Sequence, residues 1–230
     1  MNGKLKIGIV IADTDEYKPL KAKMGQLGGK QTTVAGRLAH KFAINNAEIT
    51  SVLCGIGKVN AAVAATALAE QGIDIILNCG LSGGISGISK NEITVPNKFL
   101  EHDFDLTGLG YARCEKPSQE YIYFADKNLS ELLSDKFENV KFGTAVSGDC
   151  FVQNDELRNF LRDEFSAMSC DMETAAIAYV CNIYGVKFAC VRKISDDAGN
   201  TAGESYSKIN ALAEDILVNG VLELITEISA

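Results

Sequence analysis

The stretch Ser169–Asp197, SCDMETAAIAYVCNIYGVKFACVRKISDD, holds the pattern that decides the fold. Its first part has apolar residues at helical spacing and ends at Gly185, a residue typical of the position that follows a helix. Its second part is an apolar run that predicts a buried strand. Acidic residues stand where the helix begins, at Asp171 and Glu173, and where the strand ends, at Asp196. Two carboxylates, one from each of these ends, can converge on one ligand, where they could hold a sugar and protonate a leaving group without a metal ion.

Strand and helix patterns alternate along the rest of the chain, which is typical of an α/β fold. We predict a single domain, residues 1–230, with a central mixed, largely parallel sheet flanked by helices. Ligands of such sheets bind at the carboxyl ends of the strands. Polar or glycine-containing segments follow the predicted strands at residues 13–16, 54–58, 79–84, 147–151 and 195–204. The predicted strands are residues 5–12, 40–44, 48–53, 74–78, 92–95, 140–146 and 186–194, and the predicted helices are 17–24, 59–70, 127–135, 155–165, 172–184 and 206–228.

Composition narrows the class of protein. The chain has 230 residues, 47% of them hydrophobic, with a net charge of −8 and a pI near 4.9. This acidic balance argues against nucleic acid and anionic membrane as partners, because both are bound by basic patches. No apolar run approaches the roughly 18 residues of a transmembrane helix, and the start of the chain is too short for a signal peptide. Seven cysteines without a CxxC pair predict buried, reduced thiols in a cytoplasmic protein.

Each acidic or glycine-rich motif also has a purely structural explanation. Glu16 and Glu173 stand near helix N-termini, where the helix dipole favours negative charge. Asp196 differs because it closes a buried strand, where desolvation would raise the pKa of a carboxyl group and suit a general acid. The segments 55–57 and 80–84 fit tight turns as well as ligand contacts, and they match neither the dinucleotide-binding nor the P-loop pattern.

Histidine chemistry is weakly supported. The chain has two histidines, and the segment His102–Asp105 has no second histidine nearby to complete a metal site, while His40 lies in no motif. We therefore predict no metal site, and neither a Ser-His-Asp nor a Cys-His nucleophile. The carboxylates remain as the catalytic groups.

Seven segments, in order along the chain, form a specific set: KIGIV with Glu16, CGIGKVNAA, NCGLSGG, HDFDLTGLGY, SGDCFV, DMETAAIAYVC and VRKISDDA. They resemble motifs of the methylthioadenosine/S-adenosylhomocysteine nucleosidases of the nucleoside phosphorylase superfamily. KIGIV with Glu16 is similar to the family's first strand and catalytic glutamate. The resemblance covers nearly the whole chain and implies a nucleoside phosphorylase-like fold and no metal or organic cofactor.

The resemblance implies separate roles for the three acids. Glu16 would be the general base that activates water, and Glu173 would hold the ribose hydroxyls with Met172 beside the sugar. Asp196 would protonate N7 of adenine, supported by Ser195. The mechanism would parallel glycoside hydrolysis, with a protonated leaving group, an oxocarbenium-like sugar and water on the opposite face.

Other implied contacts surround the base and the 5′ side of the nucleoside. Phe151 would stack on the purine, the backbone of Val152 would read its edge, and Tyr206 would lie near the ribose. The family is usually dimeric, with segment 102–111 near the partner's pocket, which implies a homodimer here. The expected site is completed by Leu81, Ser82, Gly83 and Asp13.

Three segments depart from the family's pattern. Residues 11–13 read Ile-Ala-Asp where the family has Gly-Ala-Met, Leu81 stands in place of a serine, and Asp171 replaces a glutamate. Asp13 and Leu81 would line the ribose and 5′ side, so the preferred 5′ substituent stays open. A carboxylate at Asp13 is expected to penalise a purely apolar substituent.

We predict a hydrolase that cleaves the N-glycosidic bond of an adenine nucleoside of the methylthioadenosine or S-adenosylhomocysteine type. It would release adenine and a 5-substituted ribose, in nucleoside catabolism and methionine salvage. A phosphorylase is an alternative, but it needs arginines around a phosphate, and none lies in segments 55–58 or 79–84, where Lys58 could bind an anion. A nucleosidase with another 5′ preference and a non-catalytic nucleoside-binding relative are further alternatives.

Overall fold

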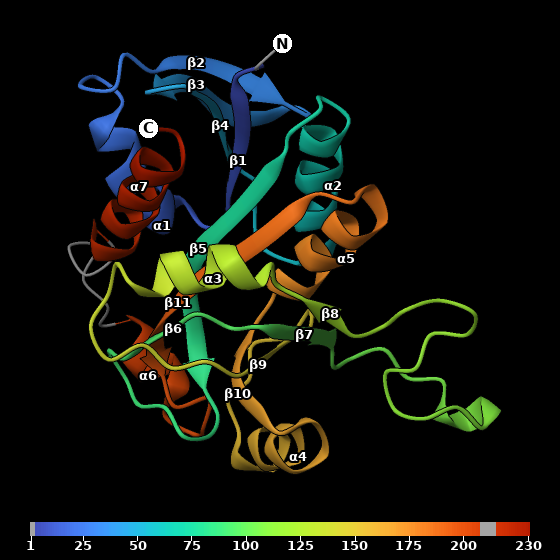
Figure 1. The fold of residues 1–230 in the computed structure, drawn as a ribbon. Coiled ribbons are helices and arrows are strands. Elements are labelled where there is room, and N and C mark those ends of the chain that lie inside the picture. The colour runs from blue at the N-terminus through green and yellow to red at the C-terminus, as the bar shows by residue number, and fades with distance from the viewer. Residues whose placement is uncertain (1–2, 208–214) are drawn as a thin grey trace.

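The structure is a computed structural model that describes residues 3–207 and 215–230, without the side chains of residues 205–207. One mixed sheet runs through the described part (Figure 1). Its strands are β1 (Leu5–Ile11), β2 (Lys30–Val34), β3 (Arg37–Ile44), β4 (Ala47–Leu53), β5 (Ile75–Gly84), β6 (Ile93–Thr94), β7 (Lys98–Glu101), β8 (Tyr123–Phe124), β9 (Thr144–Ser147), β10 (Ala167–Asp171) and β11 (Lys187–Asp196).

The centre of the sheet is parallel, and an antiparallel pairing joins each flank to it. β1 pairs in parallel with β4 and β5, and β5 pairs in parallel with β11. The antiparallel strands β2 and β3 extend the sheet beyond β4. On the other flank β5 pairs antiparallel with β10, which runs parallel to β9, as β9 does to β7. The prediction of a mixed α/β sheet with helices on its faces is confirmed.

Helices cover both faces of the sheet. They are α1 (Thr14–Lys23), α2 (Lys58–Ala69), α3 (Lys127–Ser134), α4 (Asp155–Phe165), α5 (Thr174–Tyr184), α6 (Ala202–Ser207) and α7 (Asp215–Ile228), with a 3-10 turn η1 (Thr107–Leu109). Ile7 and Ile9 of β1 pack in one apolar cluster with α1, α3 and α7, whereas Val10 packs in another with α2 and α5. Successive strand side chains point to opposite faces, so β1 is buried on both faces of the sheet.

Residues 79–84 differ from the prediction of a glycine loop. β5 continues through them to Gly84, paired with β11 on one side and β10 on the other. A Cβ on Gly80 would lie 2.5 Å from Nη1 of Arg192 and 2.8 Å from Oε1 of Glu16. The glycine is therefore needed because two functional side chains approach the strand there, not because the chain turns.

Two further differences affect the site. β11 runs to Asp196, so this residue ends a strand where the prediction began a loop at residue 195. β10 was not predicted, because its short sequence AMSCD carries no strand periodicity. The predicted helix 206–228 is present as α7 over its C-terminal part, Tyr206 lies in α6, and residues 208–214 lie outside the described part.

The segment 102–122 leaves the body of the molecule as a long irregular excursion, as its polar, aperiodic sequence predicts (Figure 1). It carries the apolar side chains of Leu109 and Tyr111, which are 74% and 38% exposed. None of the helices that the structure describes has the length and apolar character needed to cross a membrane.

Candidate active site

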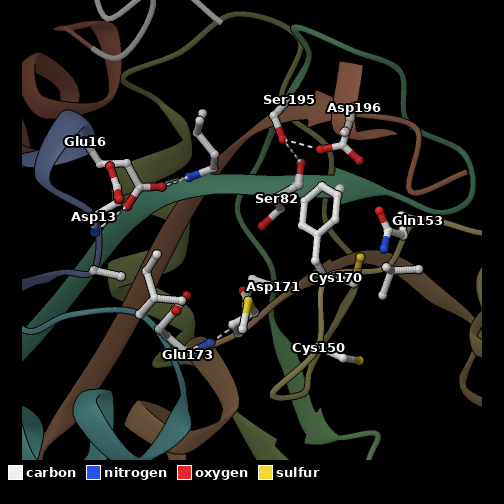
Figure 2. Close-up of a pocket in the computed structure, with 18 residues that line it drawn as sticks. Asp13, Glu16, Ser82, Cys150, Gln153, Cys170, Asp171, Glu173, Ser195 and Asp196 are labelled. Atoms are coloured by element: carbon white, nitrogen blue, oxygen red, sulfur yellow. Dashed lines mark hydrogen bonds between the residues drawn. The ribbon is translucent and has the colours of Figure 1, made fainter. Parts of the chain in front are cut away.

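A cavity of about 420 Å³ lies at the carboxyl ends of β1 and β11 and beside the last residues of β5 (Figure 2). It brings together the predicted site residues except Tyr206, whose side chain lies outside the described part. Those that line it are Asp13, Glu16, Leu81, Ser82, Gly83, Phe151, Val152, Met172, Glu173, Ser195 and Asp196. Residues that were not predicted as part of the site complete the wall: Ala12, Ile56, Cys150, Gln153, Cys170, Asp171 and Gly203.

Glu16 is fixed by a capping box at the start of α1. The side chain of Asp13, the N-cap residue, accepts a hydrogen bond from the Asp15 N–H at 2.7 Å, and Oε2 of Glu16 accepts one from the Asp13 N–H at 3.3 Å. Oε1 of Glu16 accepts a further bond from the Leu81 N–H at 2.7 Å. The helix-capping explanation and the functional one therefore hold together, because the cap orients a buried carboxyl group along the cavity wall.

Asp171 and Glu173 lie together at the start of α5 in different environments. Asp171 accepts hydrogen bonds from the Ser147 hydroxyl at 2.6 Å and from the Glu173 N–H at 3.0 Å. Burial opposes its charge, but Arg192 and the hydrogen bonds outweigh burial and lower the pKa of Asp171. Glu173 accepts a bond from the Gly57 N–H at 2.8 Å, and burial with the charge of Asp171 raises its pKa to about 7. Asp171 is therefore held in its ionised form, whereas Glu173 changes its protonation state near pH 7.

The raised pKa of Glu173 predicts a pH-dependent stability. Its ordinary value is 4.5, so between pH 4.5 and 7 the unfolded chain loses this proton while the folded chain keeps it, and folding stability falls as pH rises. The side chain in Glu173→Gln cannot ionise. The free energy of unfolding of this variant, relative to that of the wild type, should therefore rise from pH 5 to pH 8.5 by up to about 3 kcal/mol. Urea unfolding at both pH values measures this. Glu131→Gln, on the exposed face of α3, is the control, and an equal change in both variants would contradict the assignment.

Asp196 ends β11 with 2% of its surface exposed. Its Oδ1 accepts a hydrogen bond from the Ala198 N–H at 2.8 Å. The Ser195 hydroxyl lies 2.6 Å from Oδ2 of Asp196 and 3.1 Å from the carbonyl oxygen of Ser82 (Figure 2). Burial raises the pKa of Asp196 despite these bonds, which favours the neutral form that a proton donor needs.

Arg192 supports the site from beneath and was not predicted as part of it. Its guanidinium donates to Oδ1 of Asn78 at 2.6 Å and to the Thr174 hydroxyl, and it lies 3.4 Å from Oδ2 of Asp171. The side chain is 1% exposed. Arg192 and Lys193 interrupt an apolar run. Side chains of neighbouring strand residues point to opposite faces, so one of the two must be buried and needs a partner, which is the signal by which the sequence could have identified Arg192.

The wall between the acids is mostly apolar, and Ser82 adds a polar group to it. Phe151 is 41% exposed and Val152 is 4% exposed. Ser82 is 4% exposed, and its hydroxyl has no hydrogen-bond partner among the described residues. Figure 2 shows this hydroxyl directed away from Ser195. The cavity thus offers flat apolar surface for a base and polar groups at both ends.

The described residues contain no group of three or more His, Cys, Asp or Glu side chains that could hold a metal ion. The carboxyl groups of the cavity come from separate elements: Glu16, Glu173 and Asp196, whose pKa is raised by burial.

Comparison with known proteins places this cavity in a family context. A family model described as the phosphorylase superfamily matches residues 6–225. A 5′-methylthioadenosine/S-adenosylhomocysteine nucleosidase of Haemophilus influenzae is 33% identical, over 95% of this chain and 99% of its own. The Helicobacter pylori nucleosidase of the same name, solved with a pyrrolidinol that carries an aminopyrrolopyrimidine, has a TM-score of 0.92 at 27% identity, over 98% of this chain and 100% of its own. A futalosine hydrolase of Helicobacter pylori has a TM-score of 0.91 at 27% identity, over 97% and 98%.

Proposed function

The chain belongs to the phosphorylase superfamily, and within it to the methylthioadenosine/S-adenosylhomocysteine nucleosidases, and we propose that it hydrolyses the N-glycosidic bond of an adenine nucleoside of that type. The products are adenine and a 5-substituted ribose. The observation that carries this proposal is the convergence of Glu16, Glu173 and Asp196, from three separate elements, on one cavity of about 420 Å³.

The proposed mechanism gives each acid one task. Asp196, whose buried carboxyl group favours its proton, protonates N7 and makes adenine a better leaving group. Glu173 accepts hydrogen bonds from the ribose hydroxyls while the sugar develops oxocarbenium character. Glu16 takes a proton from water, which attacks on the face opposite the base. Phe151 and Val152 hold the purine, and Met172, Ser195 and Tyr206 keep the supporting roles that the family resemblance implies.

Phosphorolysis is less well supported, because the nearby cations are already engaged. Nζ of Lys58 lies 2.9 Å from Glu101 and 2.5 Å from Asp103, and the guanidinium of Arg192 is bound to Asn78, Thr174 and Asp171. Among the described residues that line the cavity none is lysine or arginine. A phosphate dianion would therefore enter a site lined by carboxylates without a free counter-charge.

Adenine release decides between these reactions. The protein is incubated with 5′-methylthioadenosine and with S-adenosylhomocysteine, with and without phosphate, and free adenine is followed. We expect release that does not depend on phosphate. Phosphate-dependent release would identify a phosphorylase, and binding without release would identify a non-catalytic relative. A nucleosidase of another 5′ preference, as the similarity to a futalosine hydrolase allows, would release adenine from a different nucleoside.

We further propose a homodimer, a cytoplasmic location and a role in methionine salvage. The exposed side chains of Leu109 and Tyr111 on the segment 102–111 favour a partner chain, because apolar groups projected away from the body gain by being covered. All seven cysteines are free, and six of them are buried, as in proteins of a reducing compartment. Sedimentation of the purified protein measures the oligomeric state.

A further inference from the structure

A second cavity, of about 460 Å³, adjoins the one that holds the three acids. The two cavities share Ala12, Asp13 and Ile56, which therefore form the junction between them. Beyond the junction the second cavity reaches the start of β3 at Arg37. None of the roles proposed above uses this space. A substituent that extends from the nucleoside toward Asp13 would enter this second cavity.

Asp13 makes the junction negative. Its side chain is partly exposed and lies beside that of Glu16, so two carboxyl groups stand on this side of the first cavity (Figure 2). Oδ1 of Asp13 accepts from the Asp15 N–H at 2.7 Å, but each carboxylate oxygen has a second lone pair and accepts a further donor. An ammonium group binds favourably at this position, because it donates hydrogen bonds to the carboxylate. An alkyl group would desolvate the carboxylate without replacing its hydrogen bonds to water.

Arg37 supplies the opposite charge in the same cavity. It donates to Oδ1 of Asn60, whose Nδ2 donates to the Ile56 carbonyl at 2.7 Å, so the guanidinium is tied to the junction itself. Its Nη1 lies 3.7 Å from the place that a Cβ on Gly55 would take. Arg37 is exposed, and its other N–H groups have no acceptor in the described part of the chain. A guanidinium in this state suits a carboxylate, which it binds with two parallel hydrogen bonds.

We propose that Asp13 and Arg37 form a charge-reading subsite that selects a 5′ substituent ending in both an ammonium and a carboxylate group over an uncharged alkylthio substituent. The ammonium binds Asp13 and the carboxylate binds Arg37. This proposal rests on the proposed function, because it assigns the 5′ end of the same nucleoside. S-adenosylhomocysteine carries such an amino-acid end, and 5′-methylthioadenosine does not.

The competing explanation is that Asp13 only caps α1 and that Arg37 only ends the β2–β3 turn. Asp13→Asn separates the two, because asparagine caps a helix as well as aspartate does but carries no charge. Arg37→Gln likewise keeps a donor for Asn60 and removes the guanidinium. The matched controls are Asp15→Asn, which changes the same charge in the first turn of α1, and Lys41→Gln, which removes a cation from β3; neither residue lines the two cavities.

The measurement is the ratio of kcat/KM for S-adenosylhomocysteine to that for 5′-methylthioadenosine. We expect the ratio to fall about tenfold or more in both Asp13→Asn and Arg37→Gln, the size expected for loss of a charge-assisted interaction. The two controls should keep the wild-type ratio. Two truncated ligands sharpen the test: the analogue without the amino group should lose its sensitivity to Asp13→Asn, and the analogue without the carboxylate should lose its sensitivity to Arg37→Gln.

Dissociation constants measured by calorimetry in an Asp196→Asn background repeat the comparison without turnover. A wild-type protein that binds both nucleosides but releases no adenine would therefore contradict the proposed hydrolysis. The subsite would still be tested by the ratio of the two dissociation constants. An unchanged ratio in either Asp13→Asn or Arg37→Gln overturns the subsite, because the proposal needs both charges. So does a wild-type protein that binds neither nucleoside.

Discussion

An Asp196→Asn variant is expected to release adenine about a hundred to ten thousand times more slowly than the wild type, the usual contribution of a positioned general acid. Asparagine has no acidic proton to give to N7, so adenine would have to leave as an anion. Binding should survive, because the amide keeps the size and polarity of the side chain. Single-turnover adenine release gives the rate, and calorimetry with the same nucleoside gives the affinity.

The fold should tolerate this change because asparagine imitates the protonated aspartic acid. Its amide oxygen accepts the Ala198 N–H, and its NH₂ group donates to the Ser195 hydroxyl. That hydroxyl has one proton, which then goes to the Ser82 carbonyl 3.1 Å away. In the wild type the same hydroxyl turns to Oδ2 of Asp196 at 2.6 Å once the acid has lost its proton, so Ser195 accommodates both states of the reaction.

Asp197→Asn is the matched control, because Asp197 is the next acid in the chain, is exposed and does not line the cavity. We expect its rate to stay within about threefold of the wild type, as for a surface change. Wild-type turnover by Asp196→Asn would refute the assignment of the acid. A loss in Asp196→Asn that is accompanied by a lower unfolding midpoint would assign it a structural role instead.

Local patterns were sufficient to predict most elements and the cavity wall. Apolar runs marked the buried strands, and Gly185 marked the end of α5, where it has the left-handed φ of 65° that glycine adopts without strain. The position of Asp196 at the end of such a run marked it as a buried acid. These features depend on neighbours along the chain, which is why the sequence alone reveals them.

Features that depend on distant pairing could not be predicted in this way. Residues 79–84 look like a loop because their glycines have no strand propensity, yet they pair with β11 and β10. The reason for Gly80 is the approach of Arg192 and Glu16, which come from opposite ends of the chain. The pKa of Glu173 likewise depends on burial and on Asp171, not on its place near a helix N-terminus.

Arg192→Met is expected to lower the free energy of unfolding by about 3–5 kcal/mol, the usual cost of removing one partner from a buried ion pair. Asp171 would remain buried without its counter-charge, and Asn78 and Thr174 would each lose a donor. Guanidinium denaturation measures the change. Arg162→Met is the control, since that exposed arginine pairs with its neighbour Asp163 and donates to Asn159 on the surface of α4, and its loss should cost less than about 1 kcal/mol.

A double-mutant cycle separates the charge from the packing. Asp171→Asn removes the carboxylate that Arg192 neutralises, so the double variant should lose less stability than the two single changes added together, with a coupling of about 1–3 kcal/mol. Strict additivity would show that the charge pair with Asp171 contributes nothing and that Arg192 acts through its packing and its other hydrogen bonds. Because Nη1 of Arg192 and Oε1 of Glu16 both approach Gly80, the single variant should also misplace the water base, and kcat should fall in Arg192→Met even under conditions in which the protein is fully folded.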